Sequence, residues 1–243
     1  MKFAMGILML SKALIETHLD LPYPYNIHLF DSLDSTQSYL KSLAPSNVIE
    51  ICLSESQSEG RGRLGRVWES PHGKNIYCSF RLPFSLEKLQ GLSLVLGLGL
   101  YKVLENYSDL SLKWPNDLYW QDKKLAGILV ELLAGNIPLI GFGLNVNDSD
   151  QSLLEKGRIS LALISGKEVE RSALVASILN TMFSSLLCFK DEGFLPFHKA
   201  WTAVDYLYGK SYSVGKLSGK ARGVDKEGYL LLEDEQFILH KCH

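Results

Sequence analysis

The chain has 243 residues, of which 46% are apolar and 21% are charged, a composition typical of a globular protein. Its formal net charge is −2 at pH 7 and its sequence pI is near 6.3, so a general electrostatic attraction to nucleic acid or anionic lipid is not expected. The four cysteines form no CxxC pair, which argues against structural zinc and a disulfide framework and favours a reducing cytoplasm.

Two apolar runs need to be distinguished from membrane segments. Residues 3–10 follow Lys2 like the apolar core of a signal peptide, but the run has no small-x-small cleavage site. Polar residues return at Ser11 and Lys12, so we expect no export. Residues 91–100 are flanked by charged residues and fall well short of the roughly 20 needed to span a bilayer. We interpret this second run as a buried helix and expect no membrane contact.

The first half of the chain predicts alternating strands and helices. Residues 26–43 predict a strand, a polar loop and a helix, with N-cap residue types at 34–36. Residues 48–55 are β-branched and apolar, which favours a strand. Residues 75–82 alternate apolar and polar side chains, the period of a half-buried strand. A buried helix is predicted over roughly 85–106.

The second half predicts hairpins and one long helix. Residues 110–120 are interrupted by Pro115 and predict two strands about a tight turn. Two apolar runs flank residues 134–136, which predicts an antiparallel hairpin. Residues 171–190 carry apolar side chains every three or four positions, as in an amphipathic helix.

The residue pattern of the sequence changes after Trp201, where short apolar stretches alternate with turns that contain Gly and Lys. This pattern predicts a small β-module, with a boundary near residue 205. We therefore expect an α+β domain in residues 1–204, built on a mixed, largely antiparallel sheet, and a small β-domain in residues 205–243.

Several familiar motifs are missing from the sequence: the GxxxxGK[ST] phosphate loop, GxGxxG, the GxSxG elbow and HExxH. The six histidines have no metal-ligand spacing. Chemistry must therefore be sought in other segments.

The run EGRGRLGRVW at 59–68 concentrates positive charge in an otherwise balanced chain. On an extended backbone Arg61 and Arg63 point the same way, and the interleaved glycines let backbone N–H groups join them around an anion. Guanidinium geometry suits carboxylate or phosphate, and Trp68 offers a stacking surface. We expect a loop that is mobile when empty and ordered when filled. A solvated loop or an RNA contact is the alternative, but a short run between two strands favours a small anion.

A second polar group of residues lies in the segment 113–131. Asn116 and Asp117 occur at a strand break, where they can face a ligand or a Mg²⁺ ion. Lys124 opens an apolar strand, from which its ammonium can reach inward. From spacing alone, a Pro-Asn-Asp turn with solvated Lys123 and Lys124 is the simpler interpretation.

Four motifs taken together resemble the biotin protein ligases, that is, the biotin–[acetyl-CoA-carboxylase] ligases. They are DSTQS at 34–38, GRGRLGRVW with a preceding Gln57, KWPNDLYWQDKKLAGILVE, and GFGLNVN at 141–147. The match runs in order from about residue 28 to 147 and continues weakly beyond. The resemblance implies a catalytic α+β domain related to class II aminoacyl-tRNA synthetases and lipoate ligases, followed by a small SH3-like β-barrel.

The resemblance also implies a reaction. Such enzymes join biotin to ATP with Mg²⁺, release pyrophosphate, and pass the biotinyl group from biotinyl-5′-AMP to one lysine of a carrier protein. The expected carrier is the biotin carboxyl carrier protein of acetyl-CoA carboxylase. The expected location is the cytoplasm.

By resemblance, particular residues take particular roles. The biotin site would comprise Ser35, Thr36, Gln37, Gln57, Gly60, Arg61, Gly62, Arg63, Lys124 and Gly127. The ATP and adenylate site would comprise Arg63, Trp68, Asn116, Asp117 and Asn145, with Asp117 as the candidate Mg²⁺ ligand. Lys124, Arg61 and Arg63 would be catalytic, with Lys124 contacting the biotin carboxylate and the α-phosphate to stabilise developing charge.

The sequence departs from the family pattern at three places. Position 37 is Gln where the family usually has Asn. Only about 25 residues precede the catalytic domain, too few for the helix-turn-helix of some members, so no DNA binding is expected. The chain ends at HKCH without the usual final GE, so the last barrel strand should be short or missing. Family dimers pair through a sheet edge, and the sequence leaves a homodimer open.

Three rival functions remain. A lipoate or octanoate ligase would share the fold and the chemistry, although the GRGR loop speaks against it. A nucleic-acid-binding regulator would use the Arg-Gly loop, and its binding would depend strongly on salt. A degenerate paralogue would bind biotin without turnover, which intact Lys124 and Arg61 argue against.

Overall fold

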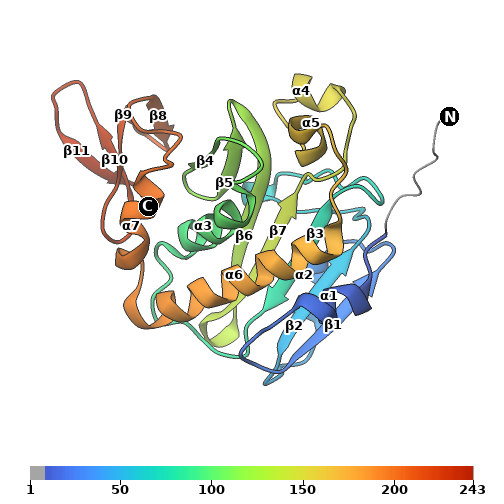
Figure 1. The fold of residues 1–243 in the computed structure, drawn as a ribbon. Coiled ribbons are helices and arrows are strands. Elements are labelled where there is room, and N and C mark those ends of the chain that lie inside the picture. Colours follow the sequence, from blue (N-terminus) through green and yellow to red (C-terminus); the bar gives the residue numbers. More distant parts are fainter. Residues whose placement is uncertain (1–8, 243) are drawn as a thin grey trace.

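The computed structural model describes residues 9–242, which form two β-sheets and their covering helices (Figure 1). Most of the apolar run at 3–10 lies outside the described residues, so the expectation that it is no signal peptide stays a prediction. The larger sheet has seven strands and the smaller sheet has four.

The seven-stranded sheet has the order β1-β2-β3-β7-β6-β5-β4. Its strands are β1 (Tyr25–Phe30), β2 (Ile49–Ser54), β3 (Ile76–Arg81), β4 (Leu110–Lys113), β5 (Asp117–Trp120), β6 (Lys123–Leu133) and β7 (Ile137–Leu144). β1 and β2 pair in parallel, and every other neighbouring pair is antiparallel. The predicted mixed, largely antiparallel sheet is confirmed.

Helices cover both faces of this sheet. They are α1 (Lys12–His18), α2 (Thr36–Ser42), α3 (Leu92–Leu104), α4 (Ser152–Glu155), α5 (Leu161–Ser165), α6 (Arg171–Glu192) and α7 (His198–Thr202). α3 and α1 pack against α6 on the face with the large apolar core (Figure 1). α2 packs with Cys52, which alternates along β2 with core residues Ile51 and Leu53, so α2 lies on the opposite face.

The predicted elements of the first domain are present, with two corrections. The helix predicted from residue 85 begins only at Leu92, because the chain must first turn at Gly91, whose φ is +85°. Strand β3 was predicted to be half-buried, and it is buried on both faces. The polar face of β3 is covered because α2 packs on it, and there the Arg81 guanidinium donates to the carbonyls of Leu40, Leu43 and Ala44.

The predicted hairpin is confirmed as β6 and β7, joined by the 3₁₀ turn Ala134–Asn136. The long amphipathic helix is confirmed as α6. By length and hydropathy α6 is the one described helix that could cross a membrane, but it is mostly buried, as the core helix of a folded domain is. The short helices α1, α4, α5 and α7 were not predicted, because each is too brief to show a clear period.

The C-terminal residues form the second sheet, which is antiparallel with the order β11-β10-β9-β8. Its strands are β8 (Ser211–Val214), β9 (Leu217–Val224), β10 (Leu230–Glu233) and β11 (Leu239–Cys242). The last strand, expected to be short or missing, is the four-residue β11 paired with β10. The segment before this sheet is tied to β4 by hydrogen bonds from Leu112 N to Val204 O and from Tyr206 N to Leu112 O. The boundary at 205 stays a prediction.

Candidate active site

A cavity of about 530 Å³ lies on the α2 face of the large sheet. Its walls come from the start of α2, the arginine loop (residues 60–68), strands β3 to β7, and the end of β8 in the C-terminal sheet. All of the predicted site residues line this cavity except Gly60 and Asn145. The cavity therefore brings together side chains that are widely separated in the sequence.

One end of the cavity is uncharged and strongly hydrogen-bonded. The backbone N–H of Thr36 donates to Oε1 of Gln57 over 2.9 Å, and the Thr36 and Ser79 hydroxyl oxygens lie 2.8 Å apart. The Ser79 hydroxyl donates to Oε1 of Gln37 over 2.9 Å, and Gln37 Nε2 donates to the carbonyl of Leu139. The Thr36 hydroxyl also lies 3.2 Å from Gln57 Oε1, to which it can donate. We call Thr36, Gln37, Gln57 and Ser79 the polar cluster.

Two further residues complete this end. Ser35 caps α2, its hydroxyl accepting from Ser38 N, and it is buried in the cavity wall. Ser79 was missed from the sequence, although the alternation of residues 75–82 already placed it on the same face as Tyr77 and Arg81. A side chain at Gly141 would lie within 2.7 Å of Gln37 Oε1, so the first glycine of GFGLN makes room for the polar cluster.

The middle of the cavity is floored by a cross-strand pair of glycines, Gly127 on β6 and Gly143 on β7. The indole ring of Trp68 lies directly on them, and a Cβ at Gly143 would overlap the ring. The ammonium of Lys124 lies 5.3 Å from the Trp68 ring centroid, in cation–π range. The missing side chains at these two positions therefore create the space for a flat ring beside Lys124.

The arginine loop is folded into a compact turn. Gly62 N donates to Arg66 O, and Trp68 N donates to Gly60 O. A Cβ at Gly60 would lie 2.7 Å from Ser70 Oγ, so Gly60 supports the loop without lining the cavity.

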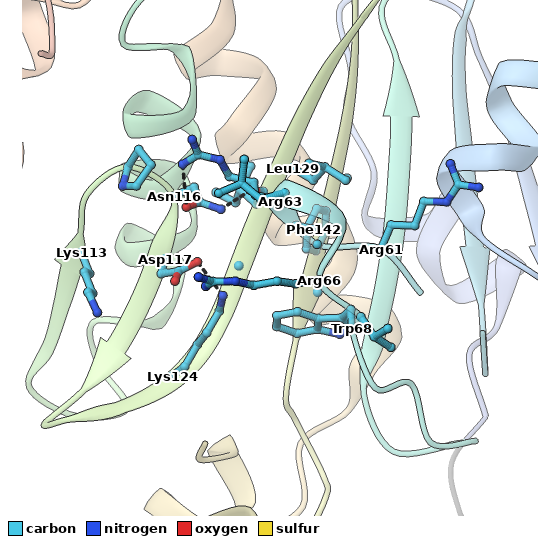
Figure 2. Close-up of a pocket in the computed structure, with 18 of the residues that line it drawn as sticks. Arg61, Arg63, Arg66, Trp68, Lys113, Asn116, Asp117, Lys124, Leu129 and Phe142 are labelled. Carbon is cyan, nitrogen blue, oxygen red and sulfur yellow. Dashed lines mark hydrogen bonds and ion pairs between the residues drawn. The ribbon is translucent and has the colours of Figure 1, made fainter. Parts of the chain in front are cut away.

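The expectation that Arg61 and Arg63 point the same way is wrong. Figure 2 shows the two guanidinium groups directed apart, with Arg63 reaching Asn116 at 3.3 Å. A 3₁₀ turn at Arg63–Gly65 breaks the extended backbone on which the expectation rested. The loop thus aims Arg63 at the turn before β5, and Arg61 points away from that turn.

Lys124 and Asp117 form an ion pair of 2.7 Å in the cavity (Figure 2). Asp117 starts β5 and Lys124 is the second residue of β6, so a tight strand connection brings the two together. Asn116 is fixed by donating to the carbonyl of Ile128. Asn145 lies outside the cavity wall and donates to the carbonyl of Ile159, so its adenine role stays a prediction.

The charge lining the cavity is strongly positive. Six cationic side chains face two carboxylates, Glu69 and Asp117. The cations are Arg61, Arg63, Arg66, Lys113, Lys124 and Arg158. Two of these cations form ion pairs, Lys124 with Asp117 and Arg158 with Glu69 at 2.6 Å. The positive charge of the other four favours a ligand that carries several negative charges.

Of the two carboxylates that line this cavity, Glu69 is paired with Arg158 and Lys156, so Asp117 is the one a divalent ion would use. Within residues 9–242 there is no group of three or more His, Cys, Asp or Glu side chains able to hold a metal. This donor set does not suit a resident metal, but it fits Mg²⁺, which commonly binds through one or two carboxylates together with substrate phosphates.

The cavity joins an uncharged polar pocket to a cationic centre that suits a ligand with several negative charges. Residues 29–147 match the Biotin/lipoate A/B protein ligase family. The chain is 36% identical over 221 residues to the bifunctional ligase/repressor BirA of Escherichia coli K12, covering 85% of this chain and 68% of that protein. It is 27% identical over 205 residues to the biotin–[acetyl-CoA-carboxylase] ligase of Mycobacterium tuberculosis, covering 75% of this chain and 73% of that protein.

The structure agrees with these sequence matches. The biotin protein ligase of Aquifex aeolicus, solved in complex with biotin and ATP, superposes with a TM-score of 0.79 at 34% identity, covering 89% of this chain and 94% of that one. The chain belongs to the biotin/lipoate A/B protein ligase family, and its matched relatives are biotin ligases.

Proposed function

We infer that the chain is an ATP-dependent biotin protein ligase, which activates biotin as biotinyl-5′-AMP and transfers it to a lysine of a carrier protein. The observation that carries this inference is the single cavity that joins the uncharged polar cluster to the cationic centre around Lys124. The similarity to an enzyme solved with both biotin and ATP supports the same conclusion.

The polar cluster suits the ureido ring of biotin. A ureido group offers two N–H donors and one carbonyl acceptor, and Thr36, Ser79 and Gln57 provide hydroxyl and amide groups at one buried end. Burial of such a ring is favourable only if its polar atoms find partners. We assign Ser35, Thr36 and Gln57 to direct contact, and we assign Gln37 to orienting Ser79.

Lys124 is placed to handle the reacting carboxylate. When biotin and ATP are bound, a carboxylate oxygen attacks the α-phosphorus, and the bond from that phosphorus to the bridging oxygen breaks. Lys124 would leave Asp117 and stabilise the negative charge that develops on the α-phosphate. Mg²⁺ bound to Asp117 would neutralise charge on the nucleotide phosphates.

The arginine loop would then protect the mixed anhydride. Closing Arg61, Gly62 and Arg63 over the adenylate excludes water that would hydrolyse it. The Trp68 ring, which lies on Gly127 and Gly143, offers a flat surface on which adenine would stack. The amine of the acceptor lysine attacks the acyl carbon, and AMP leaves with the electron pair of the broken acyl–oxygen bond.

We propose the biotin carboxyl carrier protein of acetyl-CoA carboxylase as the acceptor. A cytoplasmic location, the absence of DNA binding and the choice between monomer and homodimer stay predictions. A lipoate or octanoate ligase is not favoured, because an apolar dithiolane or alkyl end would make no hydrogen bond to the polar cluster. A nucleic-acid regulator is not favoured either, since the arginine loop is folded into a cavity wall.

Transfer to a carrier tests this function. Purified protein is incubated with ATP, Mg²⁺ and an isolated biotin carboxyl carrier domain, with biotin in one arm and lipoate in the other. We expect the mass of one biotinyl group on the domain, abolished when its acceptor lysine is changed to arginine. Modification with lipoate alone would instead assign the chain to lipoate ligation.

A further inference from the structure

The buried guanidinium of Arg81, on β3, lies against the C-terminal end of α2. Its side chain belongs to a residue only 4% exposed, and it donates to the carbonyls of Leu40, Leu43 and Ala44 over 3.3, 3.0 and 2.7 Å. The last carbonyls of a helix have no partner within the helix, and the helix dipole favours a cation at that end. Arg81 therefore closes the end of α2.

The charge of Arg81 is stabilised by these carbonyls and not by a carboxylate. Glu50 lies directly opposite Arg81 on β2, but its carboxylate pairs with His28 at 2.8 Å. Within residues 9–242, Arg81 forms no ion pair, and its hydrogen bonds go to the α2 end. A buried charge is costly unless fixed dipoles replace its hydration. The position of the guanidinium and the position of α2 therefore depend on each other.

The helix α2 needs such contacts, because its seven residues are too few for a stable isolated helix. In its first turn, Gln37 accepts from the Ser79 hydroxyl, and beyond its last turn the carbonyls accept from Arg81. Ser79 and Arg81 are two residues apart on β3, so one strand holds α2 at both ends. The ion pair of Lys41 with Glu131 is a weaker contact, since its side chains are 34% and 32% exposed.

The first turn of α2 faces the cavity. Thr36 and Gln37 line it, and the Thr36 N–H donates to Gln57 Oε1. A shift of α2 by about 1 Å would move these groups out of good hydrogen-bond geometry with a bound ring, and a misplacement of that size is costly. Arg81 itself does not line the cavity, so it can affect a ligand only through α2.

We propose that Arg81 is a positioning residue, which fixes Thr36 and Gln37 for the ureido ring of biotin by holding the C-terminal end of α2. This inference rests on the proposed function. An apolar side chain at position 81 would leave three carbonyls without their donor. The helix would then lose its fixed place, although the strands beneath it remain paired.

Hydrogen exchange tests the first part of this proposal without any ligand. In Arg81→Met we expect the amides of residues 36–42 to exchange about tenfold faster than in wild type, while α6 keeps its wild-type rates. Arg222→Met is the matched control, because Arg222 binds Glu233 in the C-terminal sheet and does not line the cavity. Unchanged exchange in α2 of Arg81→Met would overturn the proposal.

Kinetics tests the second part. In biotin-dependent pyrophosphate–ATP exchange, we expect Arg81→Met to raise the KM for biotin about tenfold. The KM for ATP and the rate at saturating biotin should stay at wild-type values, as when binding is weakened equally in the ground state and the transition state. Arg81→Lys should recover part of the affinity, because a lysine ammonium can still donate to a carbonyl.

An unchanged KM for biotin in Arg81→Met would overturn the proposal, and so would an equal rise in both KM values, which indicates a general loss of structure. If Arg81→Met does not fold, Arg81→Lys takes its place, and a rise in the KM for biotin alone is expected. If the wild-type protein shows no biotin-dependent exchange, the proposed function fails, and hydrogen exchange of α2 still decides whether Arg81 holds the helix.

Discussion

At the scale of single residues, the ion pair between Lys124 and Asp117 is the contact most directly tied to chemistry. At 2.7 Å it holds the Lys124 ammonium beside the Trp68 ring and at the centre of the cavity. The pair is only partly buried, so its contribution to folding is small. We interpret its main effect as keeping Lys124 in place until a substrate carboxylate and phosphate replace Asp117.

Removing Lys124 should therefore damage adenylation far more than folding. For Lys124→Ala we expect the rate of biotin-dependent pyrophosphate–ATP exchange to fall by about 100-fold or more, as is typical for losing one preorganised donor at a transition state. The melting temperature should change by only a few degrees. Exchange at a near wild-type rate would show that Lys124 has no role in adenylation.

Substitution of Gln37 tests whether this residue acts on biotin through its hydrogen bond with Ser79. Gln37→Met takes away the acceptor of the Ser79 hydroxyl, and we expect the KM for biotin to rise about tenfold, with the KM for ATP unchanged. If Gln37 acts through Ser79, the same substitution should have little further effect in a Ser79→Ala background. Additive effects in this double-mutant cycle would mean that Gln37 contacts biotin directly.

At the scale of elements, the arginine loop and the glycines of β6 and β7 depend on one another. The loop can fold inward only because Gly127 and Gly143 leave room for Trp68, and its turn is closed by hydrogen bonds at both ends. Arg63, the residue at the tip that reaches Asn116, joins the loop to the turn before β5. We interpret this link as the closing contact of a lid.

Arg63→Ala should weaken the lid. We expect biotinyl-AMP to be released into solution several-fold faster, while the first adenylation turnover is less affected, because the contact to Asn116 and the adenylate is lost. Rapid-filtration measurement of enzyme-bound and free adenylate checks this. Lys167→Ala, an exposed change distant in sequence from the loop, is the control, and a leak rate equal to that of the control would show that the loop is no lid.

At the scale of the whole molecule, Asp205 lies where the chain passes from the catalytic domain to the C-terminal sheet. It forms an isolated bridge with Leu112, its Oδ1 accepts from Leu207 N, and its buried Oδ2 has no hydrogen-bond partner. Burial raises the pKa of Asp205 to about 6, against the opposing effects of the backbone N–H groups of Leu207 and Tyr208 and of the Lys210 charge. The charged carboxylate of Asp205 therefore destabilises the folded state at neutral pH.

The folded pKa lies above the unfolded value of about 3.9, so the folded protein loses stability as the pH rises from about 4 to 6 and stays at the lower level above that. Asp205→Asn keeps an acceptor for Leu207 N and removes the charge. We expect the variant to be more stable than wild type by about 1–2 kcal/mol at pH 7.5 and to lose most of this advantage at pH 4.5.

Chemical denaturation of both proteins at the two pH values measures this difference. An equal difference in the free energy of unfolding at pH 4.5 and pH 7.5 would show that the ionisation of Asp205 does not contribute.

Most of the large sheet could be predicted from the sequence, because strands such as β6 and β7 carry a clear apolar pattern and a turn between them. Twelve of the proposed site residues line one cavity, since their motifs lie at the ends of those strands. The positions of Arg61, Ser79 and Lys113 could not be predicted. They depend on a 3₁₀ turn, on packing of α2 and on contact with the C-terminal sheet, none of which a local pattern encodes.

We propose that one cavity of this protein binds biotin and ATP together, and that biotin is adenylated there. The most direct test is pyrophosphate–ATP exchange on the purified protein with Mg²⁺, run with biotin, with lipoate and with neither. Exchange that depends on biotin is the predicted result and would establish adenylation. Exchange with lipoate alone, or no exchange with either by a folded protein, would contradict the claim.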